Sequence, residues 1–121
     1  MLFRSISGDG GFLFNAQELA TAVQQRISVV IVLVNDSAYG NVRRIQADSF
    51  GNRLIASDLR NPDFQKFVDS FGALALRATS PAELRQALRT AFKSDVPAVI
   101  EVPAGVMADP WPLMRQPPSR R

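Results

Sequence analysis

One stretch of the sequence limits the fold more than any other. Residues 28–34, SVVIVLV, form a run of apolar and mostly β-branched side chains without alternating polar positions. A strand of this composition is expected to be buried on both faces, as in a parallel sheet that helices cover on each side. The sequence therefore predicts an α/β fold with this strand in its interior.

Other segments predict the strands and helices that would surround it. Apolar runs predict strands over residues 2–6, 73–76 and 96–102. Helices are expected to begin after Asn15, Asn61 and Ser80. Asn15 and Ser80 are each followed three residues later by a glutamate, as in a capping box, and Asn61 and Ser80 precede a proline that suits the first helical turn. The apolar stripe of the first helix extends to Ile27, and Gly72 is expected to end the second helix.

The order of these elements predicts a three-layer αβα sandwich with a mainly parallel sheet. Residues 36–60 are expected to form a polar, glycine-containing loop with a short helix near Arg43 and Arg44. One domain is expected over residues 1–105. Residues 106–121 are rich in proline, which predicts a C-terminal tail without regular structure.

The composition excludes several classes of chemistry. The chain has 121 residues and contains no cysteine and no histidine, which excludes disulfides, thiolate nucleophiles, zinc sites and imidazole bases. The net charge is +3, but the arginines are scattered and form no basic stripe with aromatic residues, so no nucleic-acid partner is expected. No apolar run approaches the roughly 18 residues of a membrane span, and no signal peptide is evident. We therefore expect a cytoplasmic protein without a membrane partner.

Two aspartates follow two strands of the predicted sheet. Asp9 stands among three glycines after the first strand, and Asp36 follows the second. Because the carboxyl ends of parallel strands form the ligand-binding edge of an α/β sheet, both side chains could face one ligand. Glycines and a following helix suit an anion, and Mg²⁺ can join carboxylates to phosphate oxygens. A tight turn with Asp9 at the start of a helix explains the same residues without a ligand.

A longer pattern resembles a known family. Gly8-Asp9-Gly10, followed after 24 residues by Asn35-Asp36, is similar to the bipartite motif of thiamine-diphosphate-dependent enzymes. The stretches AYGNVRRIQ, DLRNPDFQKFVDSFGA and PAVIEVP also look like the diphosphate-binding domain of the acetolactate synthase and benzoylformate decarboxylase group. The resemblance covers roughly residues 5 to 112. It implies the cofactors thiamine diphosphate and Mg²⁺.

The resemblance also implies roles for individual residues. Asp9 and Asp36 would be the side-chain ligands of Mg²⁺, and the backbone carbonyl of Ala38 would be the third protein ligand. Asp36 replaces the usual asparagine of the family. The additional charge would hold the cation more firmly but would attract the phosphates less, so its effect on affinity could have either sign.

Four further positions are implied to contact the cofactor. Gly10 and Gly11 would offer backbone N–H groups to the diphosphate, while Tyr39 and Gly40 would lie on the loop that closes over it. A tyrosine in such a loop could instead pack at a subunit or domain face.

The family pattern is incomplete in this chain. Relatives have further structure before the first strand, so we expect a domain truncated at its N-terminus. The glutamate that activates the cofactor belongs to a separate pyrimidine-binding domain, and neither Glu18, Glu83 nor Glu101 matches it, so no catalytic residue is assigned. The resemblance implies decarboxylation or carboligation of a 2-oxo acid in a homo-oligomeric intact enzyme. We expect this chain to be inactive alone; the alternatives are a non-catalytic partner module and a gene remnant.

Overall fold

The fold alternates strands and helices along the chain. The computed structural model describes residues 3–105, and the predicted tail over residues 106–121 lies outside this range. The elements are β1 (Phe3–Gly8), α1 (Asp9–Asn15), α2 (Glu18–Gln24), β2 (Val29–Asn35), α3 (Gly40–Ser49), α4 (Phe64–Asp69), β3 (Leu74–Arg77), α5 (Pro81–Ala91) and β4 (Ala98–Pro103). None of the helices between residues 3 and 105 has the length and apolar character needed to cross a bilayer.

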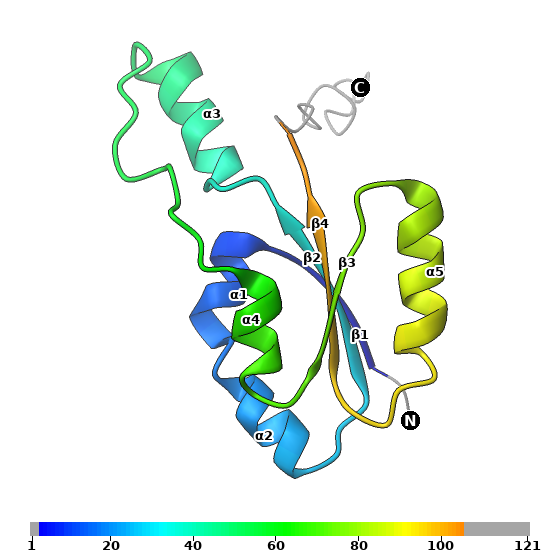
Figure 1. Cartoon of the computed structure of the whole chain (residues 1–121). Coiled ribbons are helices and arrows are strands. Elements are labelled where there is room, and N and C mark those ends of the chain that lie inside the picture. Colours follow the sequence, from blue (N-terminus) through cyan, green and yellow to red (C-terminus); the bar gives the residue numbers. More distant parts are fainter. Residues whose placement is uncertain (1–2, 106–121) are drawn as a thin grey trace, which may run out of the picture.

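The four strands form one parallel sheet in the order β1-β2-β4-β3. Helices α1, α2 and α4 cover one face of the sheet, and α5 covers part of the other face (Figure 1). This arrangement confirms the αβα sandwich with a parallel sheet. Because all strands run in the same direction, the carboxyl ends of β1, β2 and β4 lie at one edge of the sheet.

The core has one cluster on each side of the sheet. On the first side, Phe12 and Phe64 pack with their ring centroids 5.9 Å apart, above Leu33. On the second side, alanines of α5 pack against Ile100. Neighbouring residues of β4 point to opposite faces, so a single strand contributes to both clusters.

The first helix begins earlier than the capping pattern predicts. The prediction that Asn15 caps it is wrong: Asn15 is the last residue of α1, and no side-chain hydrogen bond caps α2. Helix α1 starts at Asp9, directly after β1, and has two glycines in its first turn. Glycine disfavours a helix by roughly 1 kcal/mol relative to alanine. Burial of Phe12 in the core favours the helix here and outweighs the local preference.

The start of α4 also differs from the prediction, whereas α5 agrees with it. Asp63, not Asn61, caps α4, and its side chain accepts hydrogen bonds from the backbone N–H groups of Gln65 and Lys66. Ser80 caps α5 as expected and accepts from the N–H of Glu83. The Glu83 carboxylate accepts hydrogen bonds from the backbone N–H and the hydroxyl of the preceding Thr79.

Three further expectations change or hold only in part. Residues 40–49, expected within a loop with a short helix, form the ten-residue helix α3, which projects away from the sheet (Figure 1). Strand β2 is only partly buried on both faces: Val30 and Leu33 are fully buried, each in the core cluster on its own side of the sheet, and the other residues of the strand are half-buried. Ile27 lies beyond α2 and is exposed, so it does not extend the helical stripe. Gly72, by contrast, has a left-handed φ of 78° after α4, as its predicted role requires.

Candidate cofactor-binding site

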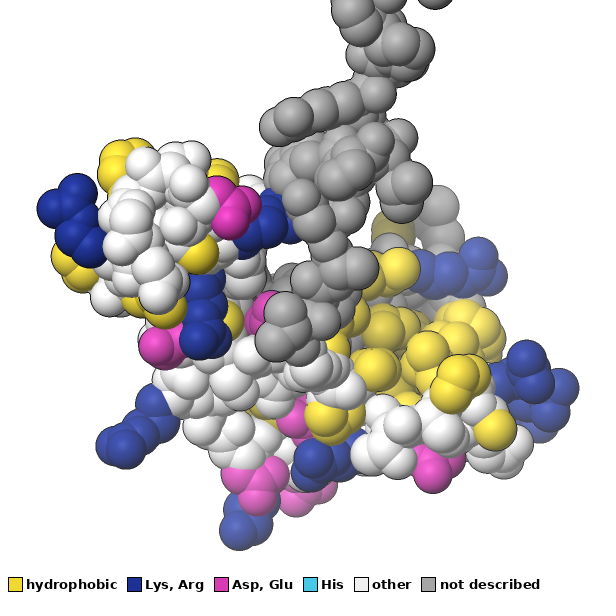
Figure 2. Space-filling view, turned by 90° about the horizontal axis from the view of Figure 1, so that it is seen from above, with side chains coloured by type: hydrophobic (Ala, Val, Ile, Leu, Met, Phe, Trp, Pro, Cys, Tyr) yellow, Lys and Arg dark blue, Asp and Glu magenta, His cyan; other side chains and the backbone are white. Residues whose placement is uncertain are grey.

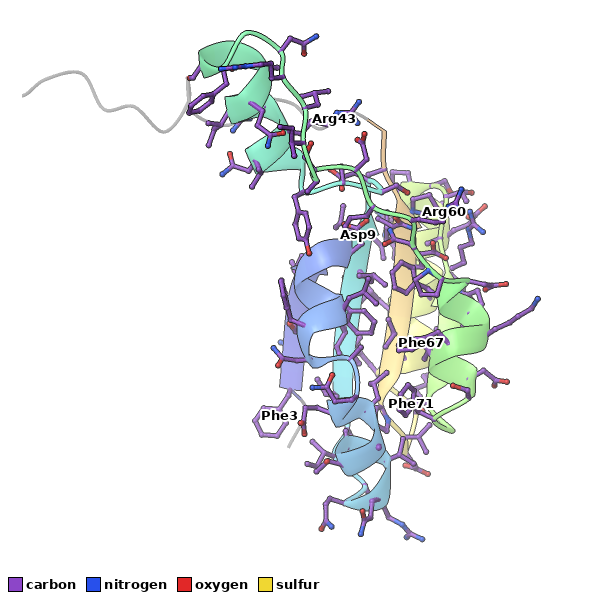
Figure 3. The ribbon with its side chains drawn as sticks, turned by 90° about the vertical axis from the view of Figure 1, so that its left-hand side faces the viewer. Phe3, Asp9, Arg43, Arg60, Phe67 and Phe71 are labelled. Atoms are coloured by element: carbon purple, nitrogen blue, oxygen red, sulfur yellow. The ribbon has the colours of Figure 1, made fainter. Side chains whose placement is uncertain are left out.

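The candidate site lies at the carboxyl edge of the sheet. Asp9 is the first residue after β1, and Asp36 is the first residue after β2. Since β1 and β2 are neighbouring parallel strands, both aspartates reach the same edge (Figure 3). Asp9 is therefore a residue at the start of a helix, as the ligand-free interpretation requires, and it also lies beside the second aspartate.

Asp9 is a buried carboxylate with fixed orientation. Its exposed fraction is 1%. Its Oδ1 atom accepts a hydrogen bond of 3.0 Å from the backbone N–H of Gly10, and its Oδ2 atom accepts one of 2.5 Å from the side-chain amide of Asn61. Buried carboxylates require such donors, because an unpaired charge is strongly disfavoured away from water.

Asp36 is half-buried and faces Asp9. Its Oδ1 atom accepts a hydrogen bond of 3.2 Å from the backbone N–H of Ala38. Burial raises the pKa of Asp36 above its ordinary value, and the negative charge of Asp9 and a hydrogen bond between the two carboxyl groups raise it further. The two side chains thus come together, and the charge of Asp9 makes ionisation of Asp36 less favourable.

A short antiparallel bridge holds the loop that follows β2. The bridge joins Ala38 to Asp58. Its hydrogen bonds run from the N–H of Tyr39 to the carbonyl of Ser57 and from the N–H of Leu59 to the carbonyl of Ser37, both 2.8 Å long. The loop after β2 contains three of the expected site residues, Asp36, Ala38 and Tyr39. The two hydrogen bonds hold this loop against residues 57–59.

Glycine is sterically required at two of the expected positions. A methyl group on Gly10 would collide with the ring of Tyr39, which lies against the first turn of α1. A methyl group on Gly40 would stand 2.5 Å from Oδ2 of Asp36. Gly11, by contrast, is exposed and has only Ser7 nearby. The tyrosine thus packs within this chain, also approaching the ring of Phe14 at a centroid distance of 6.5 Å.

Three polar residues that the sequence did not assign to the site belong to it. Asn61 donates to Asp9 and also to Oδ1 of Asn35, at 2.9 Å. Asn35 in turn donates a hydrogen bond of 2.8 Å to the carboxylate of Glu101, a residue of β4 that is only 6% exposed. The sequence pattern at Asn61 predicts a helix cap, and nothing local marks it as a partner of Asp9, which lies far away along the chain.

The donor set fits a hard divalent cation. Two facing carboxylates offer oxygen ligands, which Mg²⁺ prefers. Within residues 3–105 no third acidic residue, cysteine or histidine joins the pair, so phosphate oxygens and water would complete the coordination. A cation between the carboxylates would also remove the repulsion that raises the pKa of Asp36.

Comparison with known proteins decides the family. Residues 3–102 match the family described as thiamine pyrophosphate enzyme, C-terminal TPP binding domain. The chain belongs to this family. It is 44% identical over 99 residues to an acetolactate synthase of Bacillus subtilis, a match covering 82% of this chain and 17% of the relative. It is 35% identical over 110 residues to acetolactate synthase isozyme 2 large subunit of Escherichia coli, with 90% and 20% covered.

Solved structures agree with this TPP-binding domain in fold. Benzoylformate decarboxylase from Polynucleobacter necessarius superposes with a TM-score of 0.81 at 25% identity. A thiamine diphosphate-dependent 4-hydroxybenzoylformate decarboxylase of Rhodococcus jostii gives 0.80 at 24%. Both matches cover 88% of this chain and 20% of the other. The chain thus spans about a fifth of the length of its relatives.

Proposed function

We propose that this TPP-binding domain holds the diphosphate of thiamine diphosphate through a magnesium ion. The carboxylates of Asp9 and Asp36 and the backbone carbonyl of Ala38 bind the ion. Gly10 and Gly11 donate backbone N–H groups to the diphosphate, and Tyr39 and Gly40 lie on the loop that covers it. Binding of the cofactor by this chain therefore requires the metal.

The main support for this proposal is that the carboxyl groups of Asp9 and Asp36 lie close together. Asp9 and Asp36 come from the ends of two neighbouring parallel strands, and the charge of one raises the pKa of the other. Such a pair is unfavourable without a counter-ion, because like charges repel more strongly in a partly desolvated site. A magnesium ion supplies the counter-charge and leaves positions for phosphate oxygens.

The chain's own residues bind and orient the cofactor in this proposal. The bridge between Ala38 and Asp58 holds the backbone around Ala38 in place, and the ring of Tyr39 packs beside Gly10 at the start of α1. When bound, thiamine diphosphate supplies the chemistry for breaking a carbon–carbon bond of a 2-oxo acid.

A calorimetric titration tests the proposal. Thiamine diphosphate is titrated into the full chain with excess Mg²⁺ and again with EDTA. We expect binding only with the metal, and we expect Asp9→Asn to weaken it by about tenfold or more, as changes at metal ligands and their supports do. Asp95→Asn is the control, because Asp95 is exposed and precedes β4, at the opposite end of the sheet. Equal binding with and without Mg²⁺ would contradict the proposal.

We further propose that the chain works as part of an acetolactate synthase-like enzyme acting on 2-oxo acids. A pyrimidine-binding domain would supply the activating glutamate, so the chain alone is expected to be inactive. Pyruvate decarboxylation is measured for the chain alone and after mixing with such a domain. Activity only in the mixture supports the proposal, whereas continued inactivity supports a non-catalytic module. Absence of a cooperative thermal transition in the purified chain would instead support a gene remnant.

A further inference from the structure

Asn61 uses both hydrogens of its side-chain amide at the site. One is donated to Oδ2 of Asp9 at 2.5 Å and the other to Oδ1 of Asn35 at 2.9 Å. The Oδ1 atom of Asn61 is buried and has no hydrogen-bond partner among residues 3–105. A buried polar atom without a partner is unfavourable, so the position of this amide is set by its two donated hydrogen bonds.

The orientation of the amide follows from its neighbours. Glu101 is a buried carboxylate and can only accept hydrogen bonds when ionised. It accepts from Nδ2 of Asn35 at 2.8 Å, which turns Oδ1 of Asn35 toward Asn61. Asn61 therefore faces two oxygen acceptors, one from Asn35 and one from Asp9. If the amide group of Asn61 were flipped, its Oδ1 atom would face these two acceptor oxygens and no hydrogen bond could form.

This arrangement acts on the orientation of Asp9. Repulsion between Asp9 and Asp36 favours rotation of the Asp9 carboxylate away from its neighbour. The hydrogen bond from Asn61 opposes that rotation, together with the one from the backbone N–H of Gly10. A short hydrogen bond to a charged oxygen is stronger than one between neutral groups.

We propose that Asn61 is a positioning residue, which holds the Asp9 carboxylate turned toward Asp36 so that the two can share a cation. The inference rests on the proposed function, in which that cation is Mg²⁺. Asn61 is connected through Asn35 to the buried Glu101 of β4, so the orientation of the metal ligand depends on a strand two positions away in the sheet. The start of α4, which follows Asn61, is fixed in turn by its own cap at Asp63.

The test compares metal affinity with stability. Mg²⁺ is titrated into the full chain at saturating thiamine diphosphate, for the wild type, Asn61→Ala and the control Asn15→Ala. Asn15 is exposed at the end of α1. We expect Asn61→Ala to weaken Mg²⁺ affinity by about 10- to 100-fold, the usual effect of losing a group that orients a metal ligand. Its unfolding temperature in EDTA should stay within a few degrees of the wild type, and the control should match the wild type in both.

The outcomes separate the two proposals. If the wild type shows no Mg²⁺-dependent binding, the proposed function fails. If the wild type and Asn61→Ala bind Mg²⁺ with the same affinity, only the positioning role is overturned. A loss of affinity matched by a large loss of stability in EDTA also overturns it, because Asn61 would then be a structural residue. Should Asn61→Ala not melt cooperatively, Asn61→Ser, which keeps a small polar side chain, replaces it in the same comparison.

Discussion

Two carboxyl groups that face each other make the metal-free site unfavourable at neutral pH. The pKa of Asp36 is raised, first by burial and then by Asp9. An acid with a raised pKa in the folded state destabilises the fold once it ionises, so the metal-free protein gains stability as the pH falls through that pKa. In the metal-free protein this site therefore lowers the stability of the fold at neutral pH.

Replacing Asp36 tests this view. We expect Asp36→Asn to raise the unfolding temperature in EDTA at pH 7, because it removes one of two repelling charges. The difference from the wild type should shrink at lower pH, where Asp36 takes up a proton. Cofactor binding with Mg²⁺ should persist, since an amide oxygen can replace a carboxylate oxygen as a ligand. Complete loss of cofactor binding in calorimetry would count against the role of Asp36 as a metal ligand.

The helices show how far local patterns determine an element. The cap and proline at the start of α5 act locally, and the sequence predicts that helix start correctly. The start of α1 depends on burial of Phe12 against α4, and the sequence pattern misplaces it. Asn61 has the local pattern of a cap, but in the folded chain its side chain donates hydrogen bonds to Asp9 and Asn35 instead. Patterns within one element are therefore predictable, whereas roles that depend on distant partners are not.

The start of α5 permits a measurement of such a local interaction. The backbone N–H and the hydroxyl of Thr79 donate to Glu83, and these hydrogen bonds lower the pKa of its carboxyl below the ordinary 4.5. We expect Glu83→Gln to be less stable than the wild type at pH 7 in urea denaturation. The stabilising effect of Glu83 is lost as the pH falls through its lowered pKa, so the difference should close at a pH well below 4.5. An unchanged difference at both pH values would mean that the charge of Glu83 does not matter.

Considered as a whole, the molecule covers its sheet unequally. Among residues 3–105, three helices cover one face, whereas α5 alone covers the other and packs on β3 and β4. Hydrophobic side chains gather on the side that carries α5 (Figure 2). On β1, an edge strand, Ile6 is 80% exposed and Arg4 lies 5.3 Å from the ring of Phe92. Exposed edge strands with apolar side chains favour association with other chains.

Ile6 provides a test of this exposure. We expect Ile6→Lys to change the free energy of unfolding by no more than about 0.5 kcal/mol, as substitutions at exposed positions usually do. Light scattering should show less self-association, because the charge disfavours pairing along the edge. The matched variant Ile100→Ala removes a side chain with 0% exposure and should cost about 2–5 kcal/mol. A similar loss in Ile6→Lys would mean that Ile6 is covered in solution.

The sequence predicts the carboxyl-edge site because one topological rule is sufficient for it. Parallel strands that are neighbours place the residues after them side by side, and this brings Asp9 and Asp36 together. The pairing of the loop after β2 with residues 57–59 has no comparable rule. It joins segments separated by α3 through backbone hydrogen bonds, which no side-chain pattern encodes.

The bridge between Ala38 and Asp58 joins the two ends of the projecting segment that contains α3. Backbone hydrogen bonds hold these two ends together. The residues between them can therefore be lengthened, shortened or exchanged without changing the bridge itself. Natural variation and grafting experiments can therefore diversify this protrusion while Asp36 and Ala38 keep their positions.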